Sequence, residues 1–267
     1  MYSTTYYKAK SLDDAAKFVS ANPDAKLLSG GMTLIPSLKQ RLAQPSHLVD
    51  IGHLAELRGI EVQGDKLSIG AATKHVEVAR SDVVKKAIPA LAYLASLIGD
   101  PQVRNLGTIG GSLSNNDPAA DYPSAALALG ATIQTDRRAI AADDFFQGLF
   151  STALDSGEIT TRVAFPIPKR AAYQKFAHPA SGYAMTGVFV ADMGGSIRVG
   201  VTGAGPGVFR WKEAEAALAR SFTPGALASL SVDASGLNAD IHAPAEYRAN
   251  LVKVMATRAV EAIVGAK

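Results

Sequence analysis

The segment Arg104–Pro123, RNLGTIGGSLSNNDPAADYP, combines glycines, hydroxyl side chains and two acids, with no histidine, lysine or cysteine among them. It therefore offers no metal-ligand set and no base beside a hydroxyl that could activate a nucleophile. Backbone N–H groups and short polar side chains remain, and these groups suit the phosphates of a cofactor. The first expectation from the sequence is thus a phosphate-bearing cofactor.

A second Gly-Gly pair occurs earlier, in the stretch LLSGGMTLIP at residues 27–36. The pair Gly30–Gly31 directly follows a β-rich run, whereas the pair Gly110–Gly111 follows a predicted helix and a turn. Adjacent glycines let successive N–H groups converge on one anion and let a diphosphate approach the backbone closely. A single Gly-Gly pair is usually only a tight turn. Two such loops could hold one diphosphate without a cationic residue.

Other nucleotide-binding and metal-binding motifs are absent or weak. No G-x-x-x-x-G-K-[ST] phosphate loop occurs, and the nearest approach to G-x-G-x-x-G, GAGPGV at Gly203–Val208, is interpreted as a turn. The chain has no cysteine, which excludes disulfides and an iron–sulfur cluster held by this chain. Its five histidines lie far apart in the sequence, so we expect surface or hydrogen-bonded roles for them: His47, His53, His75, His178 and His242.

Composition predicts a globular protein of about two domains, because the chain has 267 residues. The 48% hydrophobic and 19% charged residues are ordinary values for such proteins, and no apolar run is long enough to span a membrane. The N-terminal residues do not resemble a secretory signal, so a cytoplasmic location is expected. The net charge is only +3 and the basic residues are dispersed, which argues against nucleic acid as a partner.

Hydrophobic patterning divides the chain near residue 168. Before it, β-rich runs alternate with helical stretches at 12–22 and 76–98, which predicts an α+β domain in two lobes. The prolines of FPIPKR end this pattern. Beyond them, three strands are expected at 173–176, 184–192 and 197–204, followed by helices at 211–220 and 246–264. This order fits a small antiparallel sheet that carries a few helices.

Three long stretches resemble the FAD-binding medium subunit of molybdenum-containing hydroxylases, which include the carbon monoxide dehydrogenase and xanthine dehydrogenase types. These stretches are KLLSGGMTLIPSLKQRLAQPSHLVDI, IGDPQVRNLGTIGGSLSNNDPAADYPSAALALGA and GEITTRVAFP, and the likeness continues through YQKFAHPASGYAMTGVFV almost to the end of the chain. The resemblance implies a two-lobed α+β FAD-binding domain of the vanillyl-alcohol-oxidase (PCMH) type at residues 1–168. A C-terminal α+β domain at 169–267, with a three-stranded antiparallel sheet and helices, would close over the flavin.

The resemblance also assigns roles to individual residues. Two loops would hold the diphosphate and nearby FAD atoms, namely Lys26, Leu27, Leu28, Ser29, Gly30, Gly31, Met32, Thr33 and Leu34 in the first, and Thr108, Ile109, Gly110, Gly111 and Ser112 in the second. Gly99 would approach the cofactor through its backbone, and Asp121 would accept hydrogen bonds from the ribose or adenosine part. Lys175 would place a positive charge near the isoalloxazine ring, and Tyr183 would lie against it. Neither a catalytic residue nor a metal ligand is expected in this chain.

The function that the resemblance implies is electron transfer within a molybdenum hydroxylase complex. A large partner subunit would carry the molybdenum cofactor, and a small partner would carry two [2Fe-2S] clusters that pass electrons singly to FAD in this chain, which would deliver them to an external acceptor. The expected assembly is a heterotrimer, paired into a dimer of heterotrimers. Two alternatives are a self-sufficient flavin oxidase or reductase of the same broad fold and a non-catalytic assembly subunit.

Overall fold

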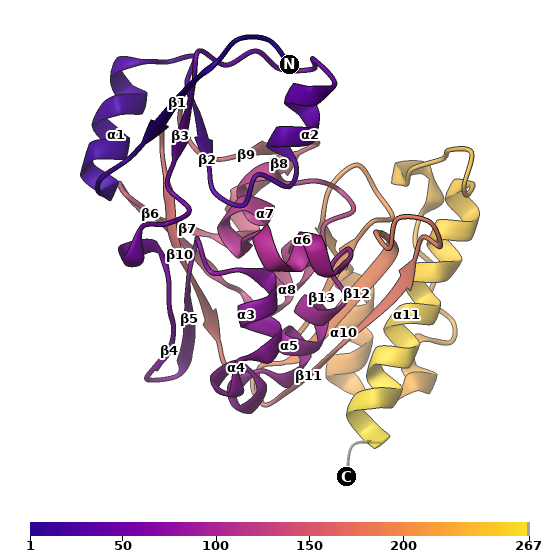
Figure 1. Ribbon diagram of the computed structural model, residues 1–267. Coiled ribbons are helices and arrows are strands. Elements are labelled where there is room, and N and C mark those ends of the chain that lie inside the picture. Colours follow the sequence, from indigo (N-terminus) through magenta and orange to yellow (C-terminus); the bar gives the residue numbers. More distant parts are fainter. Residues whose placement is uncertain (266–267) are drawn as a thin grey trace.

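The computed structural model describes residues 1–265. These residues form three main sheets, each with helices packed against it (Figure 1). The first sheet is parallel, with the strand order β1–β3–β2, and forms the N-terminal lobe. Parallel neighbours need a crossover connection, and α2 lies in the one that leads from β2 to β3. The elements of this lobe are β1 (Thr5–Lys8), α1 (Leu12–Ala21), β2 (Lys26–Leu28), α2 (Leu34–Lys39) and β3 (His47–Asp50).

The second sheet is antiparallel, with the order β4–β5–β10–β6–β7, and several short helices cover it. Its strands are β4 (Ile60–Gln63), β5 (Lys66–Gly70), β6 (Thr132–Thr135), β7 (Ala139–Ala141) and β10 (Thr160–Pro166). The helices are α3 (His75–Arg80), α4 (Asp82–Ala87), α5 (Pro89–Ser96), α6 (Pro101–Leu106), α7 (Ile109–Asn115), α8 (Tyr122–Leu129) and α9 (Ala142–Phe145). A two-stranded hairpin, β8 (Phe146–Gly148) and β9 (Ser151–Thr152), precedes β10.

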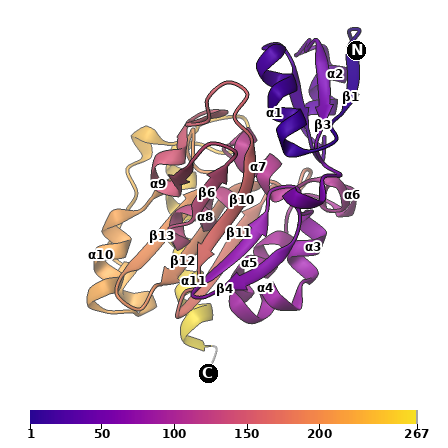
Figure 2. The same cartoon turned by 90° about the vertical axis from the view of Figure 1, so that its left-hand side faces the viewer.

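The third sheet is also antiparallel, with the order β11–β12–β13–β14, and α10 and α11 pack on it. Figure 2 shows this sheet beside the second one, while the N-terminal lobe projects from the opposite end of the molecule. The elements are β11 (Arg170–Ala177), β12 (Ala184–Asp192), β13 (Ile197–Thr202), β14 (Phe209–Arg210), α10 (Lys212–Arg220) and α11 (Ala245–Gly265).

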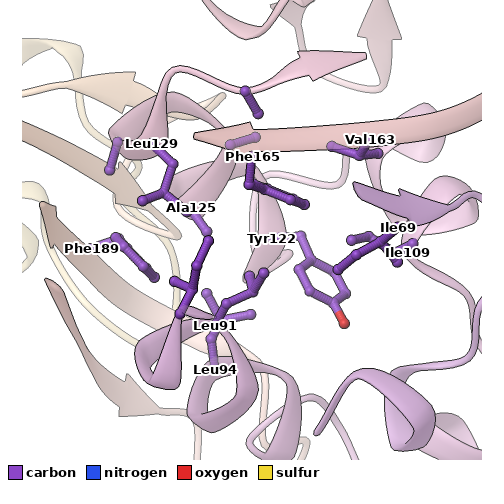
Figure 3. Close-up of a cluster of buried hydrophobic side chains, with 14 of the residues drawn as sticks. Ile69, Leu91, Leu94, Ile109, Tyr122, Ala125, Leu129, Val163, Phe165 and Phe189 are labelled. Atoms are coloured by element: carbon purple, nitrogen blue, oxygen red, sulfur yellow. The ribbon is translucent and has the colours of Figure 1, made fainter. Parts of the chain in front are cut away.

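The largest hydrophobic core joins the second and third sheets through α5 and α8. Tyr122 and Ala125 of α8 and Leu91 of α5 belong to this core together with Phe165 of β10 and Phe189 of β12 (Figure 3). All these side chains are buried. The first turn of α8, where Asp121 precedes Tyr122, is therefore held rigidly between the two sheets.

The predicted mixture of helices and strands is confirmed, with two differences in detail. The third sheet has the three predicted strands plus the two-residue β14 at its edge. The helical stretch predicted at 76–98 is divided into α3, α4 and α5, because Ser81 ends one helix and caps the next and Pro89 begins the third. The GAGPGV stretch lies outside every helix and strand, as predicted. None of the helices described is long and apolar enough to cross a membrane.

Candidate functional site

A cavity of about 760 Å³ lies between the N-terminal lobe and the second lobe. Both glycine pairs line it, because the loop after β2 and the start of α7 face each other across it (Figure 1). The predicted site residues in its wall are Lys26, Leu27, Leu28, Ser29, Gly30, Gly31, Met32, Thr33, Leu34, Gly99, Thr108, Gly110, Gly111, Ser112, Asp121 and Tyr183. Ile109 and Lys175 do not line it. The structure thus brings together residues that are far apart in the sequence.

The loop between β2 and α2 presents unused N–H groups to this cavity. Within residues 1–265, the backbone N–H groups from Ser29 to Thr33 donate no hydrogen bond. Gly31 has a φ of +70°, which favours glycine because it has no Cβ. A Cβ on Gly30 would lie 2.3 Å from the carbonyl oxygen of Leu106, so this glycine lets the loop touch the other lobe. The loop is therefore a ready anion-binding concavity.

The second glycine pair was predicted to lie in an anion-binding loop, but it lies in the first turn of α7. The N–H groups of Ile109 and Gly110 donate to the carbonyls of Thr73 and Ala71, and the N–H of Gly111 donates to the Thr108 hydroxyl at 3.2 Å. These amides are already paired, so the expected convergence of this loop's N–H groups on an anion is wrong. A Cβ on Gly110 would lie 2.5 Å from that of Ala71, which shows that packing requires this glycine.

A hydroxyl contact links the two loops. The Ser29 and Thr108 hydroxyl oxygens are 3.1 Å apart, from opposite lobes. Ser112, one turn into α7, lies in the same wall of the cavity. The second loop can therefore contribute hydroxyl groups to an anion, while the first contributes N–H groups.

Asp121 is the centre of a buried polar cluster at one end of the cavity. Only 3% of Asp121 is exposed, and its carboxylate accepts from the Tyr173 hydroxyl at 2.6 Å and from Lys175 Nζ at 3.0 Å. Lys175 Nζ also donates to the carbonyl of Leu97 at 3.0 Å. Burial raises the pKa of Asp121, against the opposing effect of the Lys175 charge. The cluster joins β11 of the third sheet to the segment that precedes Gly99.

Gly99 and Tyr183 lie at this same end. Gly99 has a φ of +48°, and the position of a Cβ on Gly182 would be 3.5 Å from the Gly99 carbonyl oxygen. The β11–β12 connection that carries Tyr183 therefore rests on the Gly99 turn. Burial, followed by the nearby carboxylates of Asp117 and Asp121, raises the pKa of Tyr183, so its hydroxyl stays protonated at neutral pH.

The sequence reasoning missed His75, which also lines the cavity. This side chain begins α3 and is 4% exposed, and its Nδ1 has no hydrogen-bond partner among residues 1–265. Burial, with a smaller contribution from Arg104, lowers the pKa of His75 to about 4. The expectation of a surface or hydrogen-bonded role is therefore wrong for this histidine. Its place in the loop between a predicted strand and a predicted helix was a signal for function.

Two other histidines, which are far apart in the sequence, are neighbours in the structure. His178 Nε2 and His242 Nδ1 are 3.3 Å apart, and their ring centroids are 4.5 Å apart. No group of three or more histidine, cysteine, aspartate or glutamate side chains that could hold a metal occurs among the described residues.

Another part of the cavity wall is formed by the segment Asp155–Thr160 together with Val19, Pro23 and Ala25 of the N-terminal lobe. Glu158 lies in this segment, and the Arg138 guanidinium, hydrogen-bonded to it at 2.9 Å, is the main reason that its pKa is lowered to about 2. The stretch GEITTRVAFP, which starts at Gly157, carries part of the family resemblance, but none of its residues was predicted to contact the cofactor.

Comparisons with known proteins identify the family to which this chain belongs. The family described as "FAD binding domain in molybdopterin dehydrogenase" matches residues 2–168, which contain both glycine loops. The chain is an FAD-binding medium subunit of the molybdenum hydroxylase family. Its relatives include the nicotine 6-hydroxylase medium subunit of Paenarthrobacter nicotinovorans, 35% identical over 96% of this chain and 95% of the relative. The carbon monoxide dehydrogenase medium chain of Afipia carboxidovorans is 34% identical over 97% and 96%.

Solved structures agree with this assignment. The medium subunit superposes on a chain of reconstituted CO dehydrogenase from Oligotropha carboxidovorans with a TM-score of 0.90, at 33% identity and 99% coverage of both chains. It superposes on a chain of quinoline 2-oxidoreductase from Pseudomonas putida 86 with a TM-score of 0.88, at 28% identity. The family and the fold that the sequence predicted are thus confirmed, and FAD is the cofactor of the family's domain.

Proposed function

We propose that FAD lies along the whole cavity, with its diphosphate on the free N–H groups of Ser29–Thr33. The unpaired N–H groups of this loop are the observation that carries the proposal, because a row of free backbone donors beside two glycines suits an anion. Thr108 and Ser112 then offer hydroxyls from the other lobe, and Gly111 leaves room for the phosphates. The adenosine part extends toward Asp155–Thr160.

The isoalloxazine ring then lies at the end formed by Gly99, Asp121 and Tyr183. Asp121 and Lys175 are 3.0 Å apart, so they cannot serve opposite ends of the cofactor as first expected. We assign both to the ring end, where Asp121 acts through Lys175 and Lys175 holds the Leu97 carbonyl that precedes the Gly99 turn. Lys175 is a positioning residue in this arrangement, because it does not line the cavity.

The proposed activity is electron relay in a multi-subunit complex. The bound flavin would supply redox chemistry that takes electrons singly and gives them to an external acceptor, and this chain's residues bind it, orient it and cover it. The relatives are named medium chains or medium subunits, which supports an iron–sulfur small subunit and a molybdenum large subunit as partners. We infer a heterotrimer that pairs into a dimer of heterotrimers. The proposed boundary between the FAD-binding and C-terminal domains, near residue 168, separates β10 from β11.

Two measurements test this function. After titration with FAD, the purified chain should bind one FAD per chain and show the absorption spectrum of bound flavin. If no FAD binds, the cofactor assignment is wrong. Reduced iron–sulfur subunit, mixed anaerobically with the FAD-loaded chain, should bleach the flavin. If no electrons pass, or if the isolated chain oxidises a small-molecule substrate unaided, the relay is wrong and a self-sufficient oxidase takes its place.

A further inference from the structure

Three successive backbone carbonyls, those of Leu97, Ile98 and Gly99, accept hydrogen bonds from cationic side chains. Lys175 Nζ donates to the Leu97 carbonyl at 3.0 Å. Arg104 Nη1 donates to the Ile98 and Gly99 carbonyls at 3.0 and 3.2 Å. These residues directly follow α5, and the last carbonyls of a helix lack partners within it and attract cations. Two cations, one from α6 and one from β11, therefore hold the turn at the ring end of the cavity.

Arg104 lies close to the cavity but does not line it, whereas Ile98 and Gly99 do. The side-chain hydrogen bonds that Arg104 makes within residues 1–265 both go to this turn. Burial and, to a smaller extent, the charge of Arg104 lower the pKa of His75, which is part of the cavity wall. Arg104 therefore reaches the cavity through the backbone that it holds.

The turn itself is closely packed against α6, the helix that carries Arg104. Gly99 has a φ of +48°, and a Cβ at this position would lie 3.1 Å from that of Val103. The start of α6 is fixed as well, because the Asp100 carboxylate accepts from the N–H of Val103 at 2.8 Å. The position of Arg104, one turn into α6, is thus set relative to Gly99.

The hydrogen bond to the Ile98 carbonyl also fixes the direction of the Gly99 N–H. The peptide bond between these two residues is trans, so its C=O and N–H point in opposite directions. Because Arg104 takes the carbonyl on one side, the Gly99 N–H is directed away from Arg104. This N–H donates no hydrogen bond within residues 1–265. The turn therefore presents a fixed and free donor at the ring end of the cavity.

We propose that Arg104 is a positioning residue for the flavin, which orients the Gly99 N–H toward the isoalloxazine ring and thereby favours the reduced cofactor. The inference rests on the proposed function, which puts the ring at this end of the cavity. Reduction adds negative charge to the ring, and a donor already held against it stabilises that charge. The role differs from that of Lys175, whose charge is balanced by Asp121 at 3.0 Å. Arg104 acts through a backbone donor and not by contact with the flavin.

The direct test is amide hydrogen exchange, measured by NMR on the full chain with and without oxidised FAD. In the unsubstituted chain FAD should slow exchange of the Gly99 amide about tenfold, the effect expected of one new hydrogen bond, and should also slow the amides of Ser29–Thr33. In Arg104→Met the slowing at Gly99 should be lost, because nothing then orients the Ile98 peptide, while the slowing at Ser29–Thr33 remains. The matched control is Asn105→Ala, which removes a side chain of the same helix that donates only to the Pro101 carbonyl, at 2.7 Å. This control should leave the Gly99 amide slow.

The flavin reduction potential of the same variants is the second measurement. Arg104→Met should weaken the binding of reduced FAD relative to oxidised FAD about tenfold, as expected for a lost hydrogen bond to a charged acceptor. For a two-electron couple this change lowers the potential by about 30 mV. Arg104→Lys keeps the positive charge without the planar fork of arginine. In this variant the potential should fall only as far as the Gly99 amide loses its protection by FAD, and it gives the same comparison if Arg104→Met does not fold.

Three results would overturn the proposal. The first is a Gly99 amide that FAD protects equally in Arg104→Met and in the unsubstituted chain, or does not protect in either. The second is a potential that falls while this protection stays unchanged, since Arg104 would then act only by its charge. The third is equal behaviour of Arg104→Met and Asn105→Ala, which would make α6 as a whole responsible. Failure of the proposed function is distinct, because a chain that binds no FAD shows no slowing at Ser29–Thr33 either.

Discussion

The ion pair between Asp121 and Lys175 gives the sharpest prediction about stability. Both side chains are 3% exposed, and the Lys175 ammonium is 3.0 Å from the carboxylate. Lys175→Met leaves the carboxylate with the Tyr173 hydroxyl as its one side-chain donor, and Asp121→Asn leaves a buried ammonium without its counter-charge. Removal of one partner of a buried pair costs on the order of 3–5 kcal/mol, because the remaining charge is uncompensated. We expect about 3 kcal/mol for each variant, since the remaining hydrogen bonds from Tyr173 and to Leu97 reduce the cost.

The double variant separates a true pair from two independent residues. Because Lys175→Met with Asp121→Asn removes both charges, its loss of unfolding free energy should be smaller than the sum of the single losses by about 2 kcal/mol. Urea unfolding at pH 7 of the four proteins completes this cycle. Losses that add to within about 0.5 kcal/mol would refute the argument, since uncoupled sites behave in that way.

The same four proteins test the effect of the pair on the flavin. The opposite charges of Asp121 and Lys175 largely cancel in their effect on a flavin ring at this end of the cavity. Removal of either charge alone should therefore shift the reduction potential of the flavin, and the two single variants should shift it in opposite directions. Lys175→Met should lower it, because an uncompensated carboxylate disfavours the added electrons, and Asp121→Asn should raise it. The double variant should return close to the unsubstituted value in a spectroelectrochemical titration. If Asp121→Asn leaves the potential unchanged, Lys175 and Asp121 do not act as a pair on the flavin.

Three further variants have separate outcomes. Gly111→Asp should abolish FAD retention, because its carboxylate would face the diphosphate. Gly111→Ala should retain most of the FAD, because a Cβ at this position meets only the Thr108 hydroxyl, at 2.9 Å. Stoichiometric flavin in the aspartate variant would contradict the diphosphate assignment. Glu158→Gln should lose about 2 kcal/mol at pH 7 and little near pH 2 in urea unfolding, because the lowered pKa of about 2 supplies stability above pH 4.5 that is lost as the pH falls. We discount the full shift because Arg138 is partly exposed to solvent screening. His75→Gln should flatten the stability profile between pH 6.5 and 4, where the unsubstituted protein loses up to about 3 kcal/mol because the buried ring resists protonation.

Hydrophobic patterns in the sequence correctly predicted elements that bury the same face, or both faces, along their whole length. The strand predicted at 184–192 is β12, and every residue of it is buried, so a mostly apolar run with β-branched and aromatic residues identified it. The helix predicted at 12–22 begins at Leu12 and ends at Ala21, where Ser11 caps its start and Ala15 and Val19 form its buried side. In both elements the residues that set the boundaries are neighbours in the sequence.

The elements that were missed depend on tertiary contacts. All eight residues of α8, YPSAALAL, are buried, so the helix shows no polar face and no amphipathic period. The division of the stretch 76–98 was also missed, although Ser81, which caps α4, and Pro89, which begins α5, mark it in the sequence.

The candidate site shows the same limit, because its important pairs span many residues. Ser29 meets Thr108, Asp121 meets Lys175, and His178 meets His242, at separations of 79, 54 and 64 residues. A single sequence shows the residue types but not their partners. Most of the predicted site residues line one cavity, whereas the contact between Asp121 and Lys175 was not foreseen, and the roles of these residues toward FAD remain predictions.

Both glycine pairs line the cavity, although the N–H groups of the second pair are not free to bind an anion. Gly30 and Gly110 are both required by packing, since a Cβ on either would lie within 2.5 Å of another residue. Gly30 brings the first loop against Leu106, and Gly110 brings α7 against Ala71. The first contact brings the two lobes close together, whereas the second lies within the second lobe and seats α7 beside the end of β5. In the proposed site the glycines would act mainly by placing the free N–H groups of one loop beside the hydroxyls of the other, and the pairing of amides within α7 is compatible with that arrangement.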